Sequence, residues 1–177
     1  KNAWAPLIGA ELAGSTVGIL GFGAVGKTLA RRLQGFDCKL LAYDTYHDTQ
    51  AAAALGVEFA DLNTVLSQSD AVSVHLALTE QTRGIIYREH LAQMKPTAVL
   101  VNTARGGLVN DQDLLAALKA GVIAGAGLDV FTVEPLPAES EYRSLENVIL
   151  TPHSASATFE AYWKMYHAAV DIAANFF

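Results

Sequence analysis

Short apolar runs alternate along the chain with stretches whose apolar residues recur at helical spacing. Apolar runs bounded by turn residues predict buried strands, and the segments between them predict helices. The predicted strands are 17–20, 39–43, 57–59, 71–74, 98–102, 122–128 and 148–150; the predicted helices are 27–33, 49–55, 62–67, 88–94, 111–120 and a long one from 159. Strands that alternate with helices indicate a parallel sheet covered on both faces, a doubly wound three-layer α/β/α fold.

A glycine motif follows the first predicted strand, with Gly21, Gly23 and Gly26 spaced G-x-G-x-x-G. The first glycine permits a tight turn, the second lets a pyrophosphate approach the backbone, and the third lets the helix pack closely on the strand. Such glycines also occur for packing alone. Asp44, however, ends the next apolar run, where a carboxylate binds the ribose hydroxyls and repels a 2′-phosphate. The pattern predicts a Rossmann-type domain that binds NAD in preference to NADP.

Composition narrows the class of protein. The 177 residues fit one domain, and 51% hydrophobic residues are enough for a sizeable core. A net charge of −6, without a basic stripe, argues against a nucleic-acid partner. Cys38 reads as a small core residue in a reducing compartment, and the five His show no metal-ligand spacing, so no metal is expected. No stretch has the length of a membrane span, so we expect a cytoplasmic protein that has no membrane partner.

Several polar residues follow apolar runs directly, and parallel strands bring such positions to one edge of a sheet, where ligands bind. Arg105 comes between a strand and two glycines, where a guanidinium could hold a carboxylate or neutralise a local acid. His153 follows a strand and a proline, and imidazole is well suited to proton exchange near neutral pH. Glu134, in the preceding loop, is either a solvated acid or the group that orients His153. Such a pair suits a dehydrogenase, because a proton must move as hydride moves. The full set of strand-end positions is Gly21, Asp44, His75, Thr103 to Arg105, Asp129 and His153.

Six segments occur in a specific order along the chain: Gly21-Phe22-Gly23-Ala24-Val25-Gly26, Val72-Ser73-Val74-His75-Leu76-Ala77-Leu78-Thr79, Met94-Lys95-Pro96, Val101-Asn102-Thr103-Ala104-Arg105-Gly106-Gly107, Leu128-Asp129-Val130-Phe131 with Glu134-Pro135, and Thr151-Pro152-His153. Together they resemble the NAD-binding domain of the D-isomer-specific 2-hydroxyacid dehydrogenases. The loop around Glu134 most resembles the D-3-phosphoglycerate dehydrogenase branch. Ser154 to Ser156 depart from that branch, which often has glycine there.

The resemblance implies a role for each matched residue. Arg105 is expected to bind the carboxylate and carbonyl end of a 2-oxo or 2-hydroxy acid, with His153 as the acid/base and Glu134 as its partner. The implied cofactor contacts are Gly21, Gly23, Ala24, Val25 and Gly26 at the pyrophosphate, Asp44 at the adenosine ribose, Leu76 with His75 before it near the adenosine half, and Thr103, Ala104, Arg105, Asp129, His153 and Ser156 toward the nicotinamide.

The resemblance also implies the organisation of the protein. Residues 1–177 would form the cofactor domain of an NAD-dependent oxidoreductase that interconverts a 2-oxo acid and its D-2-hydroxy acid. The family's flanking substrate domain is absent from this chain, and a homodimer through the cofactor domain is expected. Two alternatives stay open: an NADH-sensing binding protein resembling transcriptional corepressors of the same fold, and an isolated cofactor-binding fragment without activity.

Overall fold

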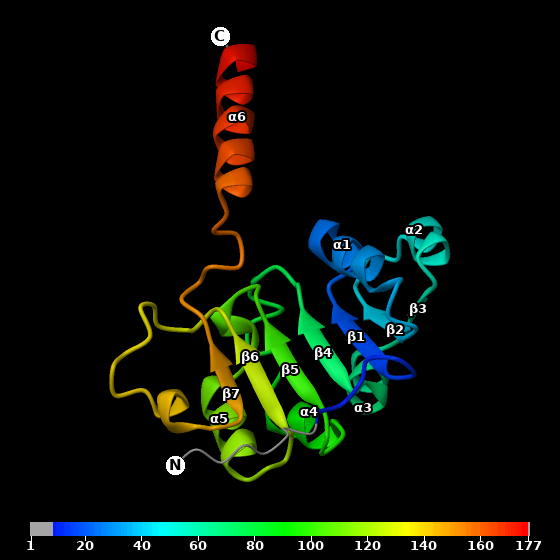
Figure 1. Ribbon diagram of the computed structural model, residues 1–177, viewed down its shortest axis with the longest axis vertical. Coiled ribbons are helices and arrows are strands. Elements are labelled where there is room, and N and C mark those ends of the chain that lie inside the picture. Colours follow the sequence, from blue (N-terminus) through cyan, green and yellow to red (C-terminus); the bar gives the residue numbers. More distant parts are fainter. Residues whose placement is uncertain (1–8, 177) are drawn as a thin grey trace.

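Seven parallel strands form one sheet in the order β3-β2-β1-β4-β5-β6-β7 within residues 9–176, the part of the chain that the computed structural model describes (Figure 1). Residues 1–8 and 177 of the predicted domain lie outside this range. The strands are β1 (Thr16–Leu20), β2 (Lys39–Tyr43), β3 (Val57–Phe59), β4 (Ala71–Val74), β5 (Val99–Asn102), β6 (Gly125–Leu128) and β7 (Val148–Leu150). The chain order reverses between β1 and β4, which confirms the predicted doubly wound fold.

Helices cover the two faces of the sheet unequally. They are α1 (Ala24–Leu33), α2 (Thr49–Ala54), α3 (Leu62–Gln68), α4 (Arg88–Gln93), α5 (Asp111–Lys119) and α6 (Phe159–Phe176), with short 3-10 turns η1 (Gly106–Leu108) and η2 (Glu141–Ser144). Side chains alternate across the pleat, so Val17 and Ile19 face α1 and α2, whereas Leu20 faces the layer formed by α3, α4 and α5. α1 and α2 cover one face of the sheet over β1–β3. The same face is left open at β7, where Ile149 is 73% exposed.

Two predicted element boundaries are wrong for local reasons. The first helix begins at Ala24 rather than at residue 27, because Lys27 N–H already donates to Gly23 O at 2.9 Å. The strand predicted over 122–128 begins only at Gly125, because Val122 N–H turns back to Ala117 O at 2.9 Å and closes the end of α5. Ile123, just before β6, is therefore buried in a helix-ending turn rather than in a strand.

The terminal helix α6 stands away from the sheet at the end of the segment that follows β7 (Figure 1). Sequence periodicity marks an apolar face that includes Trp163 and Tyr166, yet none of its described side chains is buried. Among residues 9–176, no helix is both long and apolar enough to cross a membrane.

Candidate active site and cofactor groove

The glycine loop between β1 and α1 has two glycines fixed by packing and one that faces open space. Gly21 has a φ of +102°, and a Cβ there would lie 2.6 Å from the carbonyl carbon of His75. A Cβ on Gly26 would lie 2.1 Å from Gly21 O, so only glycine lets α1 approach the loop this closely. A Cβ on Gly23 would meet no atom of residues 9–176 within 4 Å. The open side of the loop is therefore the side from which a phosphate could reach the backbone.

The start of α1 is suited to an anion. Gly23 occupies the N-cap position, and no side chain in the described part of the chain caps the helix. Free N–H groups and the positive end of the helix dipole therefore face the open side of the loop. At the neighbouring end of β2, Asp44 accepts hydrogen bonds from Phe22 N–H at 2.7 Å and from Tyr46 N–H at 3.1 Å. These bonds hold a carboxylate beside the glycine loop, and together the two features fit the pyrophosphate and the ribose of a dinucleotide.

A groove of about 560 Å³ continues from the glycine loop along the ends of β4 and β5. His75 N–H donates to Leu20 O at 2.6 Å, and its Nε2 lies 2.9 Å from Ser73 Oγ. Burial lowers the pKa of His75, which favours the neutral imidazole. The structure thus brings several predicted cofactor residues into one groove, whose lining is Val25, His75, Leu76, Ala77, Leu78, Thr103, Ala104 and Arg105.

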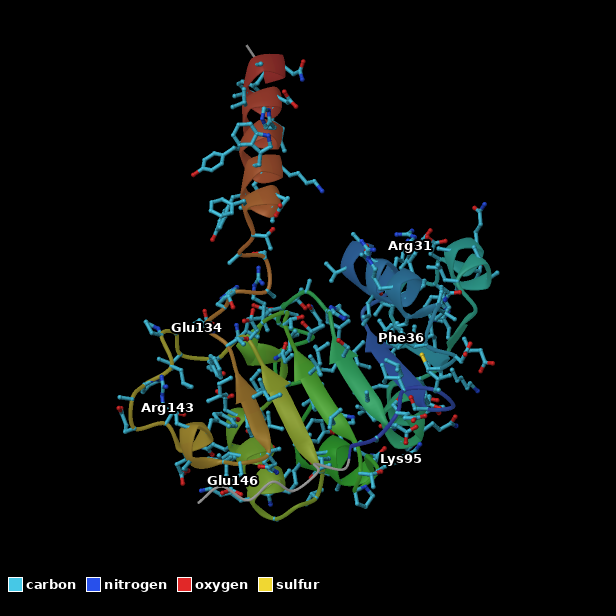
Figure 2. All side chains as sticks on the ribbon, viewed as in Figure 1. Arg31, Phe36, Lys95, Glu134, Arg143 and Glu146 are labelled. Atoms are coloured by element: carbon cyan, nitrogen blue, oxygen red, sulfur yellow. The ribbon has the colours of Figure 1, made fainter. Side chains whose placement is uncertain are left out.

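The side chains of His153 and Glu134 are in contact, an arrangement that the family resemblance implies and that the sequence alone leaves open. β6 and β7 are parallel neighbours, so the loop after β6 and the residues after β7 lie at the same, carboxyl end of the strands. Figure 2 labels Glu134 at this end, and Lys95 and Glu146 at the opposite end. His153 Nδ1 lies 2.7 Å from Glu134 Oε2, and Glu134 Oε1 accepts from Phe131 N–H at 2.8 Å. The bond with His153, helped by that N–H, lowers the pKa of the Glu134 carboxyl. No hydrogen bond within residues 9–176 engages His153 Nε2, which is the nitrogen available to a ligand.

Arg105 shares a pocket of about 240 Å³ with this pair. The buried Asn102 fixes the backbone around it: its side-chain amide donates to Arg105 O at 3.0 Å and accepts from Ala104 N–H at 3.1 Å. The guanidinium donates to Ala104 O at 2.6 Å. The structure adds Arg83, which sequence reasoning missed because it follows a turn rather than a strand. The pocket lining is Leu78, Arg83, Arg105, Gly106, Gly107, Phe131, Thr132, Glu134 and His153.

Asp129, at the end of β6, holds the segment after His153 in place. It is 3% exposed and accepts hydrogen bonds from Thr151 Oγ1 at 2.5 Å, Ser154 N–H at 2.8 Å and Ala155 N–H at 2.9 Å. Burial alone would raise the pKa of Asp129, but these bonds outweigh it and lower the pKa. His153 itself has a φ of +50°, a left-handed conformation that costs a non-glycine residue energy, and its N–H donates to Asp129 O at 2.8 Å. The loop is thus pinned around a strained residue.

The structure also places Ser156, Cys38 and the residue types that could bind a metal. Ser156 is exposed and lines neither the groove nor the Arg105 pocket. Cys38 is partly buried against the core layer of α1 and α2, as predicted. Within the described part of the chain, His, Cys, Asp and Glu form no group of three or more that could hold a metal ion.

Comparison with known proteins identifies the family. Residues 1–155 match the model of the D-isomer specific 2-hydroxyacid dehydrogenase NAD binding domain. Glyoxylate reductase from Pyrococcus furiosus is 51% identical over 161 residues, which cover 90% of this chain and 48% of that protein. Glyoxylate reductase from Korarchaeum cryptofilum is 47% identical over 167 residues, which cover 93% of this chain and 50% of that protein. The chain spans about half the length of these curated relatives.

Solved structures agree with the sequence match. D-lactate dehydrogenase with NAD+ from Lactobacillus jensenii superposes with a TM-score of 0.85 at 32% identity, covering 93% of this chain and 53% of that one. Neither curated relative above carries a phosphoglycerate dehydrogenase name, so that branch stays a prediction. The chain belongs to the D-isomer specific 2-hydroxyacid dehydrogenases and contains their NAD-binding domain.

Proposed function

We propose that this chain is the cofactor domain of an NADH-dependent reductase that converts a small 2-oxo acid of the glyoxylate class into its 2-hydroxy acid. The observation that carries the proposal is the 2.7 Å contact between His153 Nδ1 and Glu134 Oε2, in a pocket that Arg105 also lines. Arg105 also lines the groove beside the glycine loop, so the pocket and the groove share Arg105 and Leu78 as lining residues. The glyoxylate reductase relatives support the substrate class.

In the proposed reaction, a proton and a hydride are added across the substrate carbonyl. NADH, when bound, supplies the hydride to the carbonyl carbon. His153 delivers the proton from Nε2 to the carbonyl oxygen, while Glu134 holds the ring through Nδ1 and stabilises the imidazolium form. Arg105 binds the substrate carboxylate through two hydrogen bonds, which fixes the carbonyl beside His153.

For the cofactor, we propose that the open side of the glycine loop binds the pyrophosphate and that Asp44 accepts the adenosine ribose hydroxyls. The groove through Leu76 and Thr103 would lead from there toward the substrate pocket. Asp129 would position the loop after His153, because its oxygens accept hydrogen bonds from the backbone of residues 154–155. Ser156, in the same loop, would approach the nicotinamide.

We further propose that turnover needs a substrate domain that this chain does not contain, and that the protein is a cytoplasmic homodimer. The twofold length of the relatives supports the first point. The 177-residue chain alone is then expected to bind NADH but to reduce 2-oxo acids very slowly. D-3-phosphoglycerate is a second substrate for the screen, assayed in the oxidising direction with NAD+.

The test combines binding and turnover. Titration calorimetry of the 177-residue chain should show binding of NADH that is tighter than binding of NADPH. In the full-length protein, Arg105→Ala should lower kcat/KM for glyoxylate by at least about 100-fold, because the carboxylate loses a bidentate partner. The matched control is Arg88→Ala, since that guanidinium is exposed and pairs with Asp113 away from the site. Unchanged turnover in Arg105→Ala would refute the assignment, and NADH-dependent capture of a protein partner without turnover would favour a corepressor-like role.

A further inference from the structure

A second carboxylate lies close to the proposed ribose site. Asp48 lies at the end of the short segment that begins at Asp44, and its two carboxylate oxygens have different partners. Its Oδ1 accepts from Ala51 N–H at 3.0 Å as the N-cap of α2, and its Oδ2 forms an ion pair with Lys27 Nζ. The hydrogen bond with Lys27 and the cap bond together keep the pKa of Asp48 low, so the carboxylate is charged at neutral pH.

Lys27 lies in the first turn of α1, next to the glycine loop. It follows Gly26 directly, its N–H donates to Gly23 O at 2.9 Å, and its ammonium lies 6.0 Å from the centre of the Phe22 ring. The same Phe22 donates its N–H to Asp44. The cation, both carboxylates and the loop that would hold the pyrophosphate therefore share one corner of the sheet edge.

An unpaired cation at this corner would work against the selectivity expected from Asp44. A 2′-phosphate adds about two negative charges at the ribose hydroxyl, and a mobile lysine is a common ligand for such a group. Asp48 removes that possibility, because it holds the ammonium in an ion pair, with side chains that are 29% and 28% exposed.

We propose that Asp48 is a specificity-determining positioning residue, which keeps the ribose corner selective for NAD by holding Lys27 away from a 2′-phosphate. The inference rests on the proposed placement of the ribose at Asp44. It differs from direct charge repulsion by Asp48, because it requires Lys27: without the lysine, the loss of Asp48 should have little effect on NADPH.

The experiment is a double-mutant cycle on the 177-residue chain, with NADH and NADPH each titrated by calorimetry. Asp48→Ser removes the charge but retains a good helix N-cap, and Lys27→Met removes the cation but retains the apolar stem. We expect Asp48→Ser to tighten NADPH binding about threefold, the size of one exposed ion pair, and to leave NADH binding unchanged. In the Lys27→Met background, the same substitution should change NADPH binding by less than about 1.5-fold.

Controls separate this effect from a loss of structure. Asp61→Ser changes the N-cap of α3, which forms no ion pair with a lysine among residues 9–176, and should leave the ratio of NADPH to NADH affinity unchanged. Melting temperatures report folding, and Asp48→Asn replaces Asp48→Ser if the serine variant does not fold. The gain should also disappear at about 1 M salt.

Each outcome is decisive. An equal gain for NADPH with and without Lys27 would show direct repulsion by Asp48 and overturn the inference. An unchanged ratio in Asp48→Ser would do the same while leaving the proposed function intact. Failure of the unmodified chain to bind NADH would overturn the cofactor site and this inference together.

Discussion

Two alanine substitutions in the glycine loop should separate the packing role of the motif from its binding role. A Cβ at Gly26 would lie 2.1 Å from Gly21 O, a backbone atom that cannot move without displacing the turn. Overpacking of this kind costs about 2–3 kcal/mol. For a domain of this size, that corresponds to a fall in melting temperature of about 4–12 °C. Gly26→Ala should therefore be measurably less stable in thermal unfolding followed by circular dichroism.

Gly23→Ala is the matched variant, because its added methyl group meets no atom of the described residues within 4 Å and its φ of −77° suits alanine. The change at the N-cap should cost at most about 1 kcal/mol of stability. The methyl group would, however, occupy the space through which the pyrophosphate approaches. A clash of about 1–3 kcal/mol corresponds to a loss of NADH affinity of about 5- to 150-fold. Normal NADH binding by Gly23→Ala in calorimetry would refute this reasoning and leave the motif as a packing device.

Two further substitutions test hydrogen bonds in the site, and a third tests a hydrogen bond in the core. Asp129→Asn should lower the free energy of unfolding by about 2–3 kcal/mol in urea titrations, because an amide cannot accept all of the hydrogen bonds that the carboxylate accepts from Thr151, Ser154 and Ala155. The bond with His153 lowers the pKa of Glu134 below its usual 4.5, so the carboxylate stabilises the fold above that pH, and the contribution is lost as the pH falls through the lowered pKa. Glu134→Gln should therefore lose less stability than the unmodified chain in urea titrations between about pH 5 and pH 3. Tyr142→Phe should lower the free energy of unfolding by about 1 kcal/mol in the same assay, since the hydroxyl of the buried Tyr142 donates to Asp111 O at 2.9 Å. For each of the three variants, an unchanged result would contradict the role given to its hydrogen bond.

The sequence predicts this fold well because parallel strands are short and buried on the side that the helices cover. Runs such as 39–43 and 71–74 have few polar interruptions, and helix caps such as Asp61 and Asn110 mark the next element clearly. The hydrophobic pattern gives a wrong prediction where an apolar residue is buried outside a strand. Ile123 is fully buried in a turn that ends α5, and periodicity cannot distinguish that environment from a strand. It also cannot identify what an apolar helix face such as that of α6 packs against.

The site follows the same logic, with one step that sequence alone does not supply. Residues directly after a strand, such as Asp44 and Arg105, can be placed at the ligand edge as soon as the strands are known to be parallel. Glu134 lies several residues beyond β6, and its contact with His153 depends on the path of a loop held by Phe131 N–H. Arg83 lies farther still from a strand and is recognised only from the pocket lining.

The exposure of His153 and Glu134 supports the proposal that this chain contributes one wall of an active site. The side chains of His153 and Glu134 are 47% and 34% exposed. Proton and hydride transfer proceed best where water is excluded, because charges that develop on the substrate oxygen and on the imidazole are then stabilised by fixed groups. The geometry of the pair is already complete at 2.7 Å, so a covering wall needs to add exclusion of water rather than alignment. On this argument, the full-length protein should exceed the 177-residue chain far more in kcat for glyoxylate than in affinity for NADH, and equal gains in the two quantities would contradict it.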